Sequence, residues 1–204
     1  MTGTRPSLGE LLRLTANDPR RAIVAIKAME LRPAVAWQAF ALALVLTLLM
    51  IHGLSMLAGT PEPVEGALAP ALIGNPVLLG VLQGCIMVLM AFAIHWVGRA
   101  FGGTGRLEDA IGSVALLIFA MLVLNVVEFI IITLLPIAAA GVVPFHFVIF
   151  FYLLTMFVTE LHGFNRPLFV LGGIVLTMVG SMIGLSIMLA ILIVVVTGGA
   201  PANV

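Results

Sequence analysis

Long apolar runs alternate with short polar breaks along most of the chain. A helix needs roughly 20 mostly apolar residues to cross about 30 Å of hydrocarbon, so each run of that length predicts one crossing. The pattern predicts five membrane-spanning helices, at residues 34–57, 76–97, 111–135, 143–159 and 168–197. The last run is too long for an upright helix and too short for two spans, so we expect it to tilt or to bend near Gly172 and Gly173.

The first 32 residues are more polar and predict two short amphipathic helices. Ser7 and Glu10 have the spacing of a capping box, and Asp18-Pro19 offers an N-cap followed by a first-turn proline for a helix that ends near Leu31. One interpretation places this second helix in the headgroup layer, with its cations on anionic lipid, and the other packs it on the end of the bundle. The cations expected to contact lipid headgroups are Arg20, Arg21, Lys27 and Arg32.

The predicted fold class is all-α, a polytopic integral membrane protein with a five-helix transmembrane bundle and short N-terminal amphipathic helices. Residues 1–32 form the N-terminal segment, residues 33–198 the membrane domain and residues 199–204 a short tail. Hydrophobic residues make up 62% of the chain and charged residues only 9%, against roughly 45–50% and 25% in soluble domains. Nine basic and nine acidic residues give no net charge, which argues against nucleic-acid binding.

The positions of the basic residues predict the orientation in the membrane. All nine precede the first span, follow the second or follow the fourth, so they share one side of the predicted bundle. The other side carries Glu62, Glu65 and an uncharged tail. The positive-inside rule therefore places the N-terminus in the cytoplasm and the C-terminus on the outer side.

Two short motifs resemble a known family. Asp18-Pro19-Arg20-Arg21-Ala22 precedes the first span, and Gly102-Gly103-Thr104-Gly105 leads into Glu108-Asp109-Ala110 and the third span. Together with five spans after a cytoplasmic segment, these motifs make the chain similar to bacterial members of the Yip family from about Glu10 to Thr197. The resemblance implies a multi-pass protein of the bacterial inner membrane with a periplasmic C-terminus.

Eukaryotic relatives in this family are five-span proteins of the early secretory membranes, associated with Rab-type GTPases and with membrane shape and traffic. Their tyrosine-glycine-proline motifs are missing here, where Tyr152 is the only tyrosine, so GTPase binding is not expected. The resemblance favours a non-enzymatic scaffold or adaptor that acts through lipids, a membrane-protein partner or a second copy, with no cofactor.

The strongest polar signal inside a span is Glu128. An ionisable side chain costs about 2.5 to 3.5 kcal/mol to insert near mid-membrane, whereas each large apolar residue contributes roughly 0.3 to 0.6. The third span therefore still inserts, and we expect Glu128 to face protein or trapped water rather than lipid. Asn125, one turn earlier on the same face, is a candidate hydrogen-bond partner for Glu128 or for a neighbouring helix.

His52 in the first span and His146 in the fourth are predicted to lie at a depth similar to that of Glu128, with Gln83 nearby in the second span. Three interpretations are open. Glu128 is hydrogen-bonded to one histidine as a packing element, or the three residues form a proton or substrate pathway, or they bind Zn²⁺ or another divalent ion. The second and third would make the chain a small transporter, an ion pathway or a metal site.

Small residues and short motifs complete the pattern. Gly102 to Gly105 lack the spacing of a phosphate-binding loop and predict a flexible hairpin, while Glu160, His162 and Arg166 are expected to pair with one another or with Arg99. The spans contain no HExxH motif and no aspartate, which argues against an intramembrane hydrolase. Glycines with small-xxx-small spacing are expected to pack helices inside the bundle more than between copies: Gly80 with Gly84, and Gly180 with Gly184.

Overall fold

The computed structural model describes residues 6–58 and 75–197, and the described residues form helices without a strand. The predicted tail at residues 199–204, together with Glu62 and Glu65, lies outside them. In chain order the elements are α1 (Leu8–Asn17), α2 (Pro19–Ala28), α3 (Pro33–Ala58), α5 (Pro76–Ala100), α6 (Leu107–Leu134), the 3₁₀ turn η1 (Pro136–Ala138), α7 (Ala139–His162) and α8 (Pro167–Thr197).

Five of these helices, α3, α5, α6, α7 and α8, are long and apolar enough to cross a membrane, which confirms the predicted class of a multi-pass α-helical membrane protein. The predicted boundaries differ most at two helices. α6 begins at Leu107 rather than at residue 111, because Glu108 and Asp109 occupy its first turn, where the helix dipole favours negative charge. α7 begins at Ala139, ahead of Pro144, and ends at His162.

The caps predicted for the N-terminal helices are present. The Ser7 amide donates to Glu10 Oε2 at 2.8 Å and the Glu10 amide donates to Ser7 Oγ at 3.3 Å. The Arg21 amide donates to Asp18 Oδ1 at 3.3 Å, which caps α2. The second helix ends at Ala28 rather than near Leu31, since the backbone at Glu30 enters the left-handed region with φ 46°.

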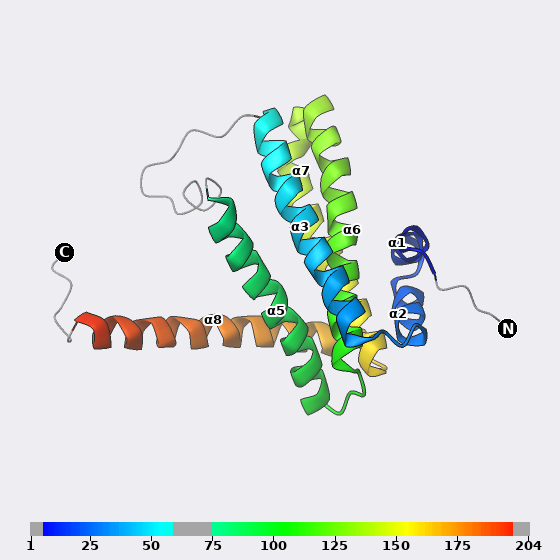
Figure 1. The fold of residues 1–204 in the computed structure, drawn as a ribbon, viewed down its shortest axis with the longest axis vertical. Helices are drawn as coiled ribbons and strands as arrows, with labels where there is room; N and C mark the ends of the chain where they lie inside the picture. The colour runs from blue at the N-terminus through cyan, green and yellow to red at the C-terminus, as the bar shows by residue number, and fades with distance from the viewer. Residues whose placement is uncertain (1–5, 59–74, 198–204) are drawn as a thin grey trace.

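α6 is the central helix of the bundle. It contacts α3, α5 and α7 as well as both N-terminal helices, and its residues from Asp109 to Leu117 are buried without interruption. In Figure 1, α3, α6 and α7 run side by side, and α5 leans away from them. The turns where α5 and α7 finish and α6 and α8 begin carry Arg99, Arg106 and Arg166, and we call this end of the bundle the cation-rich end.

α8 crosses the direction of the other long helices and extends away from them (Figure 1). It is one continuous helix of 31 residues through Gly172 and Gly173, so the bend considered from the sequence is absent. Its main neighbour is α7, and no residue in the most apolar window of its described part is buried. Because its surface is apolar on every side, lipid or another apolar surface must cover it.

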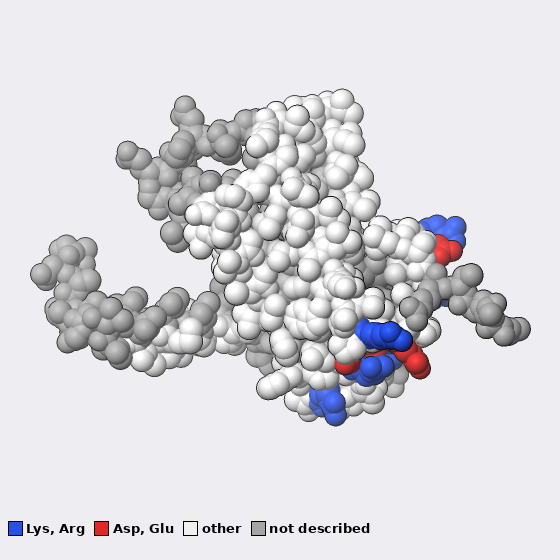
Figure 2. Space-filling view, viewed as in Figure 1, with Lys and Arg blue, Asp and Glu red and all other residues white. Residues whose placement is uncertain are grey.

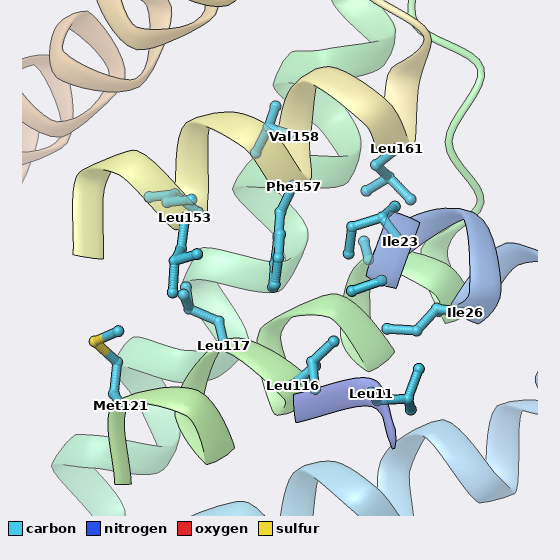
Figure 3. Packing of buried hydrophobic residues seen from close by; sticks show 13 residues of the cluster. Leu11, Ile23, Ile26, Leu116, Leu117, Met121, Leu153, Phe157, Val158 and Leu161 are labelled. Carbon is cyan, nitrogen blue, oxygen red and sulfur yellow. The ribbon is translucent and has the colours of Figure 1, made fainter. Parts of the chain in front are cut away.

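The N-terminal helices share a hydrophobic core with two of the long helices (Figure 3). Leu11 of α1 and Ile23 and Ile26 of α2 pack against α6 and α7. Among the residues that the long helices contribute, Figure 3 labels Leu116, Leu117, Met121, Leu153, Phe157, Val158 and Leu161. Burying an isoleucine contributes about 1.5–3 kcal/mol, so the apolar face of α2 is covered by protein, and the alternative of packing on the end of the bundle describes it better than a headgroup position.

Candidate functional site

Polar contacts join α2 to the end of α7 at the cation-rich end. Lys27 Nζ donates to the backbone carbonyl oxygens of Glu160 at 3.3 Å and Leu161 at 3.4 Å. Arg20 Nε lies 3.4 Å from Glu160 Oε2. The last carbonyls of a helix lack partners within the helix and carry the negative end of its dipole, so an ammonium group stabilises them.

These contacts change the interpretation of the four cations expected on lipid headgroups. Arg20 and Lys27 contact α7 instead, while Arg21 pairs with Asp18 on the surface of α2 and Arg32 is exposed. The positions of Arg20 and Lys27 on α2 explain this arrangement. Ile23 is fully buried, and at 100° per residue it lies on the helix beside Arg20 and Lys27, so these two cations border the buried face.

His162, at the end of α7, is enclosed by glycines. Its Nδ1 accepts a hydrogen bond from the Gly105 amide at 3.2 Å and its Nε2 donates to the Ile94 carbonyl oxygen at 3.0 Å. One ring nitrogen accepts and the other donates, so the contacts select the neutral tautomer with the proton on Nε2. A Cβ added at Gly98 or Gly103 would overlap the imidazole, and one at Gly105 would lie 2.9 Å from its Cε1.

Gly103 and Gly105 of this loop therefore pack against an imidazole, a contact that the sequence did not predict, while the flexibility of the hairpin stays a prediction. His162 pairs with backbone groups rather than with the charged neighbours expected from the sequence, and Glu160 pairs with Arg20. Sequence reasoning also missed Asp109, which is buried in the first turn of α6 with Oδ1 lacking a hydrogen-bond partner. Its only signal was a charged residue next to an apolar run at the start of a helix.

Glu128 of α6 faces protein, as the cost of inserting a carboxyl group in lipid suggested. Its residue is 7% exposed, and its Oε2 lies 3.0 Å from Nδ1 of His146 on α7. The other carboxyl oxygen, Oε1, is buried without a hydrogen-bond partner. Asn125 is half-buried one turn away and makes no hydrogen bond to Glu128 in the described structure.

The remaining members of the predicted intramembrane site are on other helices. His52 of α3 and Gln83 of α5 are both half-buried. Within residues 6–58 and 75–197, no three His, Cys, Asp or Glu side chains come close enough together to hold a metal ion. Zinc sites in proteins use three or four protein ligands, so the Glu128–His146 pair falls short of such a site in the described residues. The geometry supports a buried hydrogen-bonded pair.

The two glycine pairs differ in their surroundings. A Cβ at Gly80 would lie 3.0 Å from Leu48 Cδ1, and one at Gly84 would lie 3.3 Å from Leu44 Cδ2, so both glycines of α5 contact α3. A Cβ at Gly180 or Gly184 would meet nothing within 4 Å. Internal packing therefore describes the pair on α5 and does not describe the pair on α8.

Comparison with protein families matches the chain to the Yip1 domain over residues 15–196. This range includes α2, the glycine loop around His162, the Glu128–His146 pair and all of the five long helices except the last residue of α8. Comparisons with curated proteins and with solved structures gave no significant match. The family comparison therefore supports the architecture of almost the whole chain.

Proposed function

Because the chain belongs to the Yip family, a family of membrane proteins, we propose that it is a non-enzymatic scaffold or adaptor that acts through partner proteins or lipids. Three polar contacts of the described structure support this proposal, since each joins separate segments of the fold. Lys27 joins α2 to α7, His162 joins α7 to the glycine loop, and Glu128 joins α6 to α7.

The observation that carries the proposal is the fixed position of α2. One face of α2 is buried in the core, and the opposite face presents Arg21, Val24 and Ala28 to the outside. A surface that is already ordered binds a partner without the entropy cost of ordering it. Figure 2 shows the charged side chains of this view grouped over α1, α2 and the adjacent end of the bundle, while the rest of the visible described surface is uncharged.

In the proposed orientation the cation-rich end faces the cytoplasm of a bacterium, in agreement with the positive-inside rule. The outward face of α2 then meets cytoplasmic proteins or the cytoplasmic side of other membrane proteins. The long helices remain available for contacts within the bilayer. Lys27 and Arg20 keep α2 at a constant position relative to the bundle, which is what an adaptor between a membrane and a partner requires.

The test is purification in native lipid followed by mass spectrometry of the retained proteins, with wild type and two variants compared. Val24→Asp adds a negative charge at the exposed centre of the α2 face, and Asn165→Asp adds the same charge at an exposed bend after α7, outside that face. We expect Val24→Asp to lower the retained partner by about tenfold, about 1.4 kcal/mol, and Asn165→Asp to retain it. A wild-type protein that is monomeric and without a partner in native lipid contradicts the proposal.

A second candidate function is an ion or proton pathway, and the buried Glu128–His146 pair is the observation that favours it. Ionisable residues inside membrane spans commonly mark such pathways. Many secondary transporters are built from paired repeats, and five spans without a detectable repeat argue for the scaffold instead. A flux through proteoliposomes that Glu128→Gln abolishes would establish this second function.

A further inference from the structure

A groove of about 410 Å³ lies between the end of α5 and the first turns of α8. Its volume is within the roughly 300 to 1,000 Å³ of small-molecule sites in proteins. The lining residues are all apolar: Phe101, Leu168, Phe169, Gly172, Gly173 and Leu176. The four large side chains among them are at least 68% exposed, so they contribute an open hydrophobic surface.

The two glycines leave room along this groove. A Cβ at Gly172 or Gly173 would meet nothing within 4 Å, and α8 continues through both positions without a break. Glycine in the middle of a helix lowers its stability relative to alanine, and here neither a turn nor a close helix contact in the described chain requires it. Larger side chains at both positions would fill space that a ligand can use.

One arginine borders the groove, and a second lies in the last turn of the helix that ends there. The guanidinium carbon of Arg166 lies 5.5 Å from the ring centroid of Phe169, a lining residue. Arg99 is exposed in the last turn of α5, two residues before Phe101. Neither arginine forms an ion pair within the described residues, unlike Arg20, Arg21 and Arg106. Residues two apart on a helix do not share a face, so Arg166 is the arginine without an ion pair that lies beside the apolar groove.

This combination of surfaces selects the chemistry of the ligand. The lining offers hydrocarbon contacts and no polar side chain, so a soluble anion gains nothing from the groove itself. The phosphate diester of a phospholipid binds a guanidinium group through charge-assisted hydrogen bonds. A headgroup that carries its own ammonium compensates that phosphate, whereas an anionic headgroup keeps the net negative charge that an arginine without an ion pair attracts. The groove lies where apolar helices meet arginines, which is the level of phospholipid headgroups in a bilayer.

We propose that this groove binds an anionic phospholipid, with an acyl chain along Gly172 and Gly173 and the phosphate on Arg166. The site does not involve the outward face of α2, so it stands or falls separately from partner binding there. A lipid bound in this groove would contact the first turns of α8, a helix that buries little of its surface against the rest of the described chain.

The experiment is native mass spectrometry of the full chain in detergent, titrated with phosphatidylglycerol and with phosphatidylcholine of the same acyl chains. Wild type is expected to bind phosphatidylglycerol about tenfold more tightly. Gly172→Leu with Gly173→Leu fills the groove and is expected to lower that affinity by about tenfold. Gly180→Leu is the matched control, because it adds the same side chain to open space farther along α8 and is expected to change nothing.

Arg166→Gln removes the positive charge and leaves Gly172 and Gly173 unchanged, so it tests the role of the charge alone. We expect it to reduce the preference for phosphatidylglycerol to about twofold while phosphatidylcholine binding stays as in wild type. Inorganic phosphate at millimolar concentration is expected not to displace the lipid, and displacement would overturn the role of the acyl chain. Equal binding of the two lipids by wild type, or wild-type affinity in the filled variant, would overturn the proposal.

Discussion

Lys27 on α2 donates hydrogen bonds to the backbone at the last turn of α7, where the carbonyl oxygen of Glu160 lies 3.3 Å from its Nζ. The two residues are 133 positions apart in the chain. The contact packs the amphipathic helix α2 against the end of α7, rather than leaving it on lipid in the headgroup layer. Its ammonium also faces the negative end of a helix dipole, so position and charge favour the same arrangement.

The first prediction concerns this contact. Lys27→Met keeps most of the apolar stem but removes the ammonium, which leaves the carbonyls of Glu160 and Leu161 without that donor. Hydrogen bonds to charged groups contribute about 1.5–3 kcal/mol, so we expect a clearly lower melting temperature and faster proteolysis of α1 and α2. Arg20→Gln is the control, because its ion pair is partly exposed and such pairs contribute about 0–1 kcal/mol. Equal effects of the two substitutions would contradict this assignment.

The second prediction concerns the glycine loop. Gly98→Ala places a methyl group where the His162 ring lies, and overpacking of this kind costs about 1–3 kcal/mol. His162→Ala removes the ring and its hydrogen bonds to Gly105 and Ile94, so it also destabilises the protein. In the double variant the clash is absent, and we expect its loss of stability to be smaller than the two single losses added together. Thermal unfolding in detergent measures the stability of the two single variants and the double variant. Additive losses would contradict a clash between the added methyl group and the His162 ring.

Local sequence signals predicted the helices well for physical reasons. The Ser7–Glu10 box and the Asp18 cap act within one turn, and span length follows from membrane thickness, so both can be read without knowing the fold. Contacts between distant helices could not be read in this way. The enclosure of His162 requires three segments to meet in space. The sequence alone does not show which segments lie next to one another.

The Glu128–His146 pair could be predicted from the sequence only in part. The cost of burying a carboxylate predicted that Glu128 faces protein, and the pairing follows from the hairpin of α6 and α7. Both residues are equally far along the chain from residue 137 in the turn η1, so antiparallel helices bring them to the same height. What the sequence could not decide was which histidine, His52 or His146, would lie opposite Glu128, because that depends on which helix packs beside α6.

The third prediction uses this pair to separate the two candidate functions. Glu128→Gln keeps a group that can hydrogen-bond His146 but removes the ionisable proton, so a packing role predicts normal expression and a loss of stability below about 1 kcal/mol. Glu128→Leu removes the partner of a partly buried imidazole and is expected to cost about 1–3 kcal/mol. The measurements are melting temperature in detergent and proton flux in proteoliposomes. A flux in wild type that Glu128→Gln eliminates would favour the pathway over the scaffold.

The fourth prediction compares Gly80 on α5 with Gly180 on α8, each of which belongs to a pair of glycines with small-xxx-small spacing. Leucine at Gly80 would collide with the side chain of Leu48, since even a Cβ there lies 3.0 Å from its Cδ1, and we expect a loss of about 1–3 kcal/mol with a lower melting temperature. Leucine at Gly180 enters open space and replaces glycine by a better helix former, so the stability of a single copy should stay the same or increase slightly.

The same pair of variants also tests what surrounds α8. If Gly180→Leu leaves the melting temperature of the detergent-solubilised chain unchanged, the face at Gly180 and Gly184 is free of contacts within one copy, as the described structure has it. A large loss of stability at Gly180 would require a helix packed on this face, because only a close neighbour makes an added leucine side chain unfavourable. Size-exclusion chromatography of the same variant distinguishes a second copy from another helix of the same chain, since only a second copy changes the apparent mass.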